Sequence, residues 1–254
     1  MSVSAISIKN GFNIYSQLSS GKRINRAADD ASGLAIGQKL KRQENGLNVG
    51  AQNTNDGKGY LNVADGALDS ITDQLQRMRE LGLKSMNGLY SDSDREMFQT
   101  EIDQLKDSIQ TIAKGTTLNE QKLLDGSMAD MHLATNPDGG GLDIHMLDTT
   151  LESLGIADFD VTSGNFDLSA IDKALDMVAN ARSEAGAVTN RLEHTYNYNM
   201  NASEQLTAAR SRIEDLDMPK AISEKQKQDL LTQYQNMMLR SRMNQKGMVM
   251  RLFQ

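Results

Sequence analysis

The chain has 254 residues, of which 38% are hydrophobic and only 4% are aromatic, and its formal net charge is −7. It contains no Cys, which excludes disulfide bonds, thiolate nucleophiles and zinc–cysteine sites. With two Pro in total, this composition is typical of an ordered protein built from long helices and not of a disordered chain. No apolar run reaches the length of a membrane span, so we expect no insertion into a membrane. Residues 1–20 lack the basic start and apolar block of a secretory signal, so any export is expected to use a route without such a leader.

The charged residues are unevenly distributed. Residues 1–48 hold seven Lys or Arg against three acidic residues, and residues 219–254 hold seven against two, so the middle of the chain is strongly acidic. Basic ends could contact nucleic acid. However, these bases are scattered among Leu and Met without aromatic residues for stacking, and the acidic middle would repel phosphate. We therefore expect no nucleic-acid partner and interpret the basic ends as solvated faces of helices.

The first segment, residues 2–31, predicts a marginal helix followed by a turn. Gly11 interrupts its apolar pattern, and Ser19, Ser20 and Gly21 end it. A short helix of this kind has little stability alone and needs a partner. Its apolar residues are Ile6, Ile8, Phe12, Ile14 and Leu18.

A long helix is predicted over about 34–86, because apolar residues recur every seven positions as in a coiled coil. Gly50 and Gly57 occupy places where this pattern calls for an apolar residue, so the stripe is well specified only from Leu61 onward. We interpret Gly57 and Gly59 as positions where two helices approach closely. The repeat consists of Leu40, Leu47, Thr54, Leu61, Leu68 and Leu75, reinforced three residues on by Ala64, Ile71 and Met78.

A loop at 87–92 leads into a second predicted helix, 93–114. Ser93 and Glu96 match the capping box that opens a helix. Because the loop is short, the two helices should form a helical hairpin. One side of the second helix carries Phe98, Ile102, Leu105, Ile109 and Ile112.

Residues 115–167 have a different character. Residues 136–141 read Asn-Pro-Asp-Gly-Gly-Gly, which is turn chemistry, and they lie between short runs at 131–134 and 142–146. We expect one or two small β-hairpins in this region.

The last third of the chain predicts another long helix, 169–216, which no Pro interrupts before Pro219. Ser223 and Gln226 then match a second capping box, which predicts a final helix of weak stability. The long helix has an apolar face made of Leu175, Val178, Ala185, Val188, Leu192, Tyr196, Leu206, Ile213 and Leu216. The final helix carries Leu230, Leu231, Tyr234, Met237, Met238, Met243, Met248 and Leu252.

Patterns that would carry catalysis or bind a metal are weak. His132, His145 and His194 are too far apart in sequence to form a helical metal pair, and we interpret them as surface or loop residues. The adjacent Asp29 and Asp30 are better explained as caps at a helix start than as catalytic carboxylates. There is no dinucleotide or phosphate loop. We therefore predict no catalytic residue, no metal site and no cofactor.

Three stretches of the sequence closely resemble bacterial flagellins. Residues 18–36, LSSGKRINRAADDASGLAI, resemble the N-terminal flagellin signature. Residues 66–68 and 75–81, LQRMREL, are similar to the first long core helix of that family. Residues 211–218, SRIEDLDM, with 238–239 and 244–245, resemble its C-terminal signature. The resemblance covers about 17–124 and 168–252.

This resemblance implies a fold and a way of assembling. The fold is mainly α: a long antiparallel helical bundle or coiled-coil rod formed by the N- and C-terminal regions, with a small central β-hairpin region. An inner filament domain would comprise residues 1–33 plus 217–254, and an outer domain residues 34–216. Copies would add head-to-tail to a helical extracellular filament used for swimming, since a self-complementary contact would close into dimers. The terminal segments would fold on assembly.

The resemblance also implies partners. Export would proceed unfolded through the flagellar type III apparatus, with an export chaperone and with cap and junction proteins at the filament ends. An animal Toll-like receptor detects many flagellins, and the matching patch here is Gln76, Arg77, Arg79, Glu80, Leu81 and Glu101.

Two other classes of protein were weighed. A hook–filament junction protein, or another secreted flagellar protein, would share the architecture without forming long polymers. Junction proteins typically carry a Pro in the Asp-Asp motif, whereas Ala28 and Ala31 flank it here. An enzyme would need a nucleophile with a base or a metal set, and the sequence offers neither.

Overall fold

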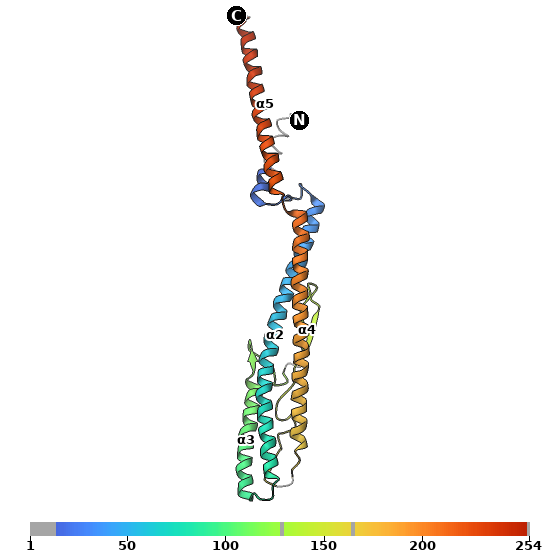
Figure 1. The fold of residues 1–254 in the computed structure, drawn as a ribbon, viewed down its shortest axis with the longest axis vertical. Coiled ribbons are helices and arrows are strands. Elements are labelled where there is room, and N and C mark those ends of the chain that lie inside the picture. Colours follow the sequence, from blue (N-terminus) through green and yellow to red (C-terminus); the bar gives the residue numbers. More distant parts are fainter. Residues whose placement is uncertain (1–13, 128–129, 164–165, 253–254) are drawn as a thin grey trace. The chain divides into compact units, whose positions relative to one another are not determined.

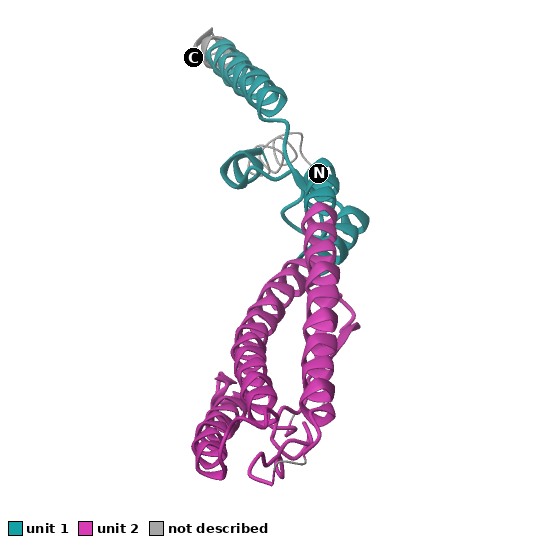
Figure 2. Ribbon diagram, turned by 60° about the horizontal axis from the view of Figure 1, so that its bottom comes forward, with its two compact units in different colours: residues 1–44, 204–254 teal, residues 45–203 magenta. Residues whose placement is uncertain are grey.

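The computed structural model describes residues 14–127, 130–163 and 166–252, with side chains as far as residue 245. The chain divides into two compact units (Figure 2): unit 1 comprises Met1–Glu44 and Glu204–Gln254, and unit 2 comprises Asn45–Ser203. Long helices dominate the described residues (Figure 1), which confirms the predicted mainly α fold with a small central β region. The helices are α2 (Ala31–Ser85), α3 (Asp92–Gly115), α4 (Ser169–Glu214) and α5 (Met218–Leu252), and the strands are β1 (Thr117–Leu118), β2 (Gln121–Lys122), β3 (Asp130–Ala134) and β4 (Gly141–His145).

The units of the single chain divide after Glu44 and Ser203. The predicted boundaries at residues 33 and 217 concern the inner and outer domains of an assembled filament, and they stay a prediction. Within the described ranges, none of the helices combines the length and the apolar character that a bilayer crossing requires.

α3 starts at Asp92, one residue before the predicted start at 93, and its capping residue, Ser91, lies two residues before the predicted Ser93. The hydroxyl of Ser91 accepts a hydrogen bond from Asp94 N at 3.3 Å, and Asp94 Oδ2 accepts one from Ser91 N at 2.9 Å. The hydrogen bond from Ser91 N to this carboxylate, and a second from Ser91 Oγ at 2.8 Å, lower the pKa of Asp94. The predicted box of Ser93 and Glu96 is wrong because the overlapping pattern two residues upstream satisfies the first N–H groups of a longer helix.

α5 also starts upstream of its predicted cap. Asp217 Oδ1 accepts a hydrogen bond from Lys220 N at 3.2 Å, so Asp217 caps the helix. Pro219 lies in the first turn, where a missing N–H costs nothing. Ser223 is inside the helix and donates its hydroxyl to Pro219 O at 3.0 Å. The predicted capping box at Ser223 and Gln226 is therefore wrong.

The core of unit 2 forms where α2, α3 and α4 lie side by side (Figure 1). The seven-residue repeat of α2 points into it, and Ile71, Leu75 and Met78 are 0% exposed. Ile109 of α3 and Val178 of α4 are buried to the same degree. Each such aliphatic side chain stabilises the fold by about 1.5–3 kcal/mol when fully buried.

Ion pairs join α2 to α4 within unit 2. The residue number of the α4 partner decreases as that of the α2 partner increases, so the two helices are antiparallel. Such partly exposed pairs add about 1 kcal/mol or less each and mainly fix register. They are Lys58–Glu193 at 3.7 Å, Asp65–Arg182 at 2.9 Å and Arg79–Asp172 at 2.6 Å.

The segment between β4 and α4 is tied to α3 by a buried lysine. Lys106 Nζ donates to Ala157 O at 2.9 Å and to Phe159 O at 2.6 Å, and the residue is 9% exposed. Burying an ammonium group is costly unless its hydrogen bonds are made, and two carbonyls supply them here. Lys106 thus anchors a segment that has no regular secondary structure.

Two β-hairpins lie in the region predicted to contain one or two. β1 and β2 are joined through Asn119 and Glu120, whose φ values of 52° and 65° are those of a type I′ turn. β3 pairs with β4 in antiparallel register, from Asp130 opposite His145 to Ala134 opposite Gly141. The predicted strands at 131–134 and 142–146 are confirmed to within one residue.

The β3–β4 hairpin lies against α2 where that helix has glycine. A Cβ atom at Gly50 would lie 2.1 Å from Thr135 O, and one at Gly57 would lie 2.5 Å from Leu133 Cδ2. Gly57 was predicted to allow the close approach of a second helix. This prediction is wrong, because the element that approaches Gly57 is strand β3. Gly59 has nothing within 4 Å.

Two amides hold the hairpin turn in this position. Asn53 Nδ2 of α2 donates to Ala134 O at 2.8 Å, and Asn199 Nδ2 of α4 donates to Thr135 O at 2.9 Å. Asn199 is 1% exposed, so its hydrogen bond is made in a dry environment where an unmade one would cost about 1–3 kcal/mol. The turn is thus fixed to both long helices of unit 2.

In unit 1, the N-terminal turn pairs with the end of α4 through backbone hydrogen bonds. Arg23 N donates to Glu214 O at 2.7 Å, and Leu216 N donates to Gly21 O at 3.0 Å. Gly21 has a φ of 68°, a conformation that favours glycine. Lys22 Nζ adds an ion pair to Glu214 Oε2 at 3.2 Å.

Candidate assembly and recognition surfaces

α5 exposes an apolar surface to solvent in the single chain. Three of its predicted assembly residues, Leu231, Tyr234 and Met238, are 51%, 59% and 45% exposed. Exposed apolar groups gathered on one element mark a binding surface, because leaving them in water is costly. The exposed apolar residues of this helix are Met218, Ile222, Leu230, Leu231, Tyr234, Met237, Met238, Leu239 and Met243.

The remaining predicted assembly residues are only partly described. Residues 14–20 are helical, and Ile14 and Leu18 are half-buried there. The ammonium group of Lys225 in α5 lies 4.8 Å from the centroid of the Tyr15 ring, a cation–π contact that ties the N-terminal segment to α5. Ile6, Ile8 and Phe12, and the side chains of Met248 and Leu252, lie outside the described residues.

The carboxylates of the N-terminal signature bind backbone N–H groups. Asp30 Oδ1 accepts from Gly33 N at 2.8 Å, at the first turn of α2. Asp29 Oδ2 accepts from Asn25 N at 3.0 Å and from Arg26 N at 2.9 Å. The capping interpretation is confirmed for Asp30, whereas Asp29 closes the turn that precedes α2.

Gly33 of the same signature, and Gly37 directly after it, lie in close contact with side chains from elsewhere in unit 1. A Cβ atom at Gly33 would lie 2.6 Å from Ile24 Cδ1, and one at Gly37 would lie 2.0 Å from Glu214 Oε1. Because Ile24 is 2% exposed and Glu214 is held by Lys22, neither neighbour can move aside easily. This signature is therefore a packing motif that joins the start of α2 to the end of α4.

Of the six residues predicted for receptor recognition, three meet in one ion-pair cluster between α2 and α3. Arg77 lies 2.7 Å from Glu101 and 3.1 Å from Glu80, measured between nitrogen and carboxylate oxygen. All three side chains are at least 40% exposed, so the cluster faces solvent. Gln76, next to it in sequence, is exposed as well.

The other two predicted recognition residues lie elsewhere. Arg79 forms an ion pair with Asp172 of α4 at 2.6 Å, on a different side of α2. Leu81 is 1% exposed and packs in the core of unit 2, so its side chain is not available to a partner.

Two of the three His residues, His132 and His145, lie on the same face of the β3–β4 hairpin. Their separation in sequence does not predict this. His132 Nδ1 lies 2.6 Å from Asp143 Oδ1, and His145 is hydrogen-bonded to Asp130 across the same two strands. The Asp143 side chain, helped by Gly139 O, raises the pKa of His132. The His132–Asp143 ion pair therefore stabilises the hairpin at mildly acidic pH. This stabilisation is lost as the pH rises through the raised pKa of His132. The described residues contain no group of three or more side chains suited to hold a metal ion.

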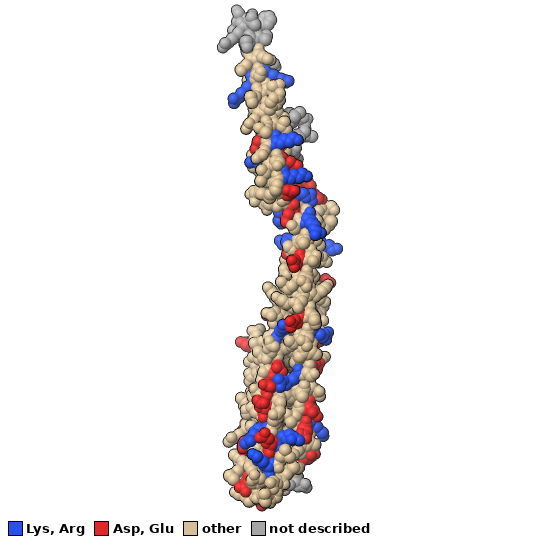
Figure 3. All heavy atoms as spheres, in the orientation of Figure 1, with Lys and Arg blue, Asp and Glu red and all other residues tan. Residues whose placement is uncertain are grey.

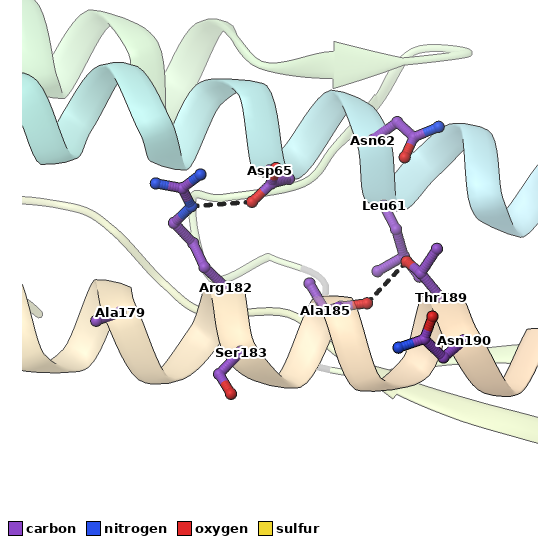
Figure 4. Close-up of a pocket in the computed structure, with 10 residues that line it drawn as sticks. Leu61, Asn62, Asp65, Ala179, Arg182, Ser183, Ala185, Thr189 and Asn190 are labelled. Atoms are coloured by element: carbon purple, nitrogen blue, oxygen red, sulfur yellow. Dashed lines mark hydrogen bonds and ion pairs between the residues drawn. The ribbon is translucent and has the colours of Figure 1, made fainter.

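One hollow of unit 2 lies between α2 and α4 (Figure 4). It has a volume of about 640 Å³, and its charged residue Arg182 is bound by Asp65 at 2.9 Å and by Asp69 at 2.6 Å. Thr189, at its other end, donates its hydroxyl to Ala185 O at 2.8 Å within α4. The side chains of Arg182 and Thr189 are thus engaged, and the residues that line the hollow include no nucleophile paired with a base.

These features define a class of protein. Helices pair through apolar stripes and ion pairs in unit 2, and Asp30 of the signature caps α2. α5 carries apolar residues that the described part of the chain leaves exposed. A helical protein of this kind is a structural subunit that completes its burial by contact with other chains.

Comparison with known proteins names the family. Residues 7–129 match the bacterial flagellin N-terminal helical region, and residues 168–253 match the bacterial flagellin C-terminal helical region. The chain belongs to the bacterial flagellin family. Proteins of this family are structural proteins of the flagellar filament, which lies outside the cell, and the chain is a filament subunit.

Similar proteins agree in length as well as in sequence. The flagellin of Halalkalibacterium halodurans is 38% identical over 255 residues, which cover 97% of this chain and 93% of that protein. The flagellin of Bacillus subtilis is 38% identical, covering 88% and 86%. The flagellar filament 30.7 kDa core protein of Treponema maltophilum is 37% identical, covering 85% and 83%.

Solved structures agree on the fold. The crystal structure of Bacillus cereus flagellin has a TM-score of 0.53 and 27% identity, covering 58% of this chain and 88% of that one. A putative flagellar hook-associated protein from Vibrio parahaemolyticus has a TM-score of 0.62 over 74% of this chain and all of that one. Its identity of 19% makes it a likeness of fold alone.

Proposed function

We propose that the subunit joins the filament through its terminal helices, with copies adding head-to-tail. The observation that carries this proposal is the apolar surface of α5, where Tyr234 and Met237 are 59% and 67% exposed in the single chain. Burying a side chain of this size on a neighbour stabilises the contact by about 1.5–3 kcal/mol. Because different surfaces would meet at each contact, the assembly does not stop at a dimer, and with a helical rotation between copies it continues to grow.

The same proposal includes the route and the partners that the flagellin family implies. The chain would leave the cell unfolded through the flagellar type III apparatus and would be met by an export chaperone and by cap and junction proteins. A chaperone would cover the apolar surface of α5 before export, because that surface is otherwise exposed to aggregation.

Seeded growth tests this function. Purified full-length chain is mixed with short filament fragments at raised salt, which screens repulsion between acidic units, and is followed by electron microscopy. We expect filaments that lengthen with time. Short stacks that stop at the seed ends would instead indicate a junction protein, and seeds that neither lengthen nor bind the chain would contradict both functions.

For the receptor, we propose that the Arg77 cluster is the recognised surface. It is the part of the predicted patch that combines exposure with a fixed geometry, since Glu80 and Glu101 hold the guanidinium group from two helices. An Arg held in this way makes an effective interface anchor, because less side-chain entropy is lost on binding.

Replacing Arg77 by Asp is expected to lower receptor activation by monomeric protein by at least about tenfold, because three carboxylates would then crowd together. Activation is measured in reporter cells that carry the Toll-like receptor. Lys84→Asp makes the same change of charge on an exposed residue of the same helix and should leave the signal unchanged. An Arg77→Asp protein that signals like the Lys84→Asp protein would dispose of the site.

A further inference from the structure

A small hollow opens on unit 2 between α2 and the turn of the β3–β4 hairpin. Its volume is about 360 Å³ and its wall is mostly apolar. The hollow exists because Gly46 lets the turn approach: a Cβ atom there would lie 2.6 Å from Pro137 Cβ. Val49 forms an apolar part of the wall and is 54% exposed. An apolar cavity of about 150 Å³ already holds a benzene ring, so this one can hold a large side chain.

No charged residue lines this hollow. Its α2 residues come from a stretch, 45–55, that contains no Asp, Glu, Lys or Arg, and its hairpin residues are equally neutral. The backbone groups of the hairpin at this place are already bound by Asn53 and Asn199. A charged ligand would therefore find no opposite charge in it, whereas an apolar or aromatic group would meet a mostly apolar wall.

α4 carries an exposed aromatic and apolar group at the same level of unit 2. Tyr198 is 66% exposed, and Tyr196 and Met200 are 38% and 45% exposed. Their neighbour Asn199 reaches Thr135 O of the same hairpin turn. The surrounding stretch, 194–203, again contains no Asp, Glu, Lys or Arg. Tyr and Met without nearby charges are the composition of the centre of a protein–protein contact.

The charge of unit 2 indicates which partner fits these two surfaces. Residues 45–203 hold 25 acidic and 11 basic side chains, so two copies repel each other wherever charged faces meet. In Figure 3 red and blue side chains are dense over the lower part of unit 2, whereas the surface at the level of the hairpin is mostly tan. Apart from Asp138 in the turn, residues 45–55, 134–139 and 194–203 at this level hold no Asp, Glu, Lys or Arg. Unit 2 of one copy can therefore approach unit 2 of another here while bringing few like charges together.

We propose that Tyr198 of one copy inserts into the hollow beside Val49 of the next copy. This contact rests on the proposed assembly into a filament and names a pair of surfaces for it. The hollow belongs to α2 and the hairpin, and Tyr198 belongs to α4, so the two surfaces differ. A contact between different surfaces can repeat from copy to copy, as a helical filament requires.

A disulfide test exploits the absence of Cys from the chain. The double variant Val49→Cys/Tyr198→Cys is grown into filaments on seeds, oxidised and separated on a denaturing gel. We expect a ladder of covalent oligomers, because each copy links to the next through a different residue. The same variant oxidised as a dilute monomer should give no ladder. Pairing Tyr198→Cys with Leu89→Cys, at a residue that is 89% exposed, is the matched control and should give none either.

Growth rates give a second measurement. Tyr198→Ala should raise the protein concentration needed for seeded growth by about tenfold or more, as for a central interface aromatic, and Leu89→Ala should leave it unchanged. Filaments of the double cysteine variant that form but yield no ladder would overturn the Tyr198 contact and leave the proposed function intact. If the unmodified chain itself fails to grow, the proposed function fails, and this contact fails with it.

Discussion

A chain that ends at Asp217 is expected not to grow filaments and yet to keep unit 2 folded. Ending there removes α5 and its apolar surface, whereas the core around Ile71, Leu75 and Met78 lies wholly in unit 2. The backbone pairing of Leu216 with Gly21 also remains. Circular dichroism and urea unfolding should give a cooperative helical protein, and seeded electron microscopy should show no growth.

A pair of charges within the full-length chain should reproduce this loss. Leu231→Glu with Met238→Glu places two carboxylates seven residues apart on one face of α5 and should slow seeded elongation at least about 100-fold. The matched control, Leu231→Met with Met238→Leu, keeps the surface apolar and of similar volume, so it should grow nearly as the original chain does. Normal growth of the truncated chain or of the Glu pair would show that α5 is not the assembly surface.

Gly50→Ala is expected to destabilise unit 2 by about 2–4 kcal/mol. The added Cβ atom would lie 2.1 Å from Thr135 O, a backbone atom that also accepts the hydrogen bond from Asn199, so the hairpin must shift and lose that bond. Equilibrium unfolding in urea measures the loss of free energy. Limited proteolysis should in addition cut the displaced turn around Pro137 faster.

The same substitution elsewhere on α2 provides the control. Gly66 is exposed, and a Cβ atom there meets nothing within 4 Å. Gly66→Ala should therefore stabilise the protein by up to about 1 kcal/mol through helix propensity alone. Equal unfolding free energies for the two Ala variants would contradict the role assigned to Gly50.

The long helices could be predicted from the sequence because their evidence is local. The repeat from Leu61 to Met78 recurs within a few turns and appears in the structure as buried residues. Helix starts were less certain, since Ser91 and Ser93 both precede an acidic residue by three positions and only the structure decides between them.

The partners of α2 could not be predicted, because they come from distant parts of the chain. Gly50 and Gly57 read as gaps in an apolar stripe, and nothing near them in sequence indicates that residues 133 and 135 fill the space. His132 and His145 likewise come together only through the register of β3 with β4.

The candidate surfaces, too, could be predicted from the sequence only in part. The exposure of Leu231 and Met238 was predictable from a helix with apolar residues and no apparent partner. Within LQRMREL, the resemblance could not separate the exposed Arg77 from the buried Leu81, because depth depends on α3 and α4. The hollow beside Val49 has one signal that was overlooked, namely two neutral stretches in an otherwise acidic unit.

The amine of Lys106 differs chemically from those of the other lysines whose side chains the structure describes, because it is shielded and already bound to two carbonyl oxygens. Reagents that modify amines will reach it only when the segment around Ala157 and Phe159 detaches from α3. The rate at which this one amine is labelled therefore reports how often unit 2 opens locally, in the monomer and in the filament alike, without any introduced probe.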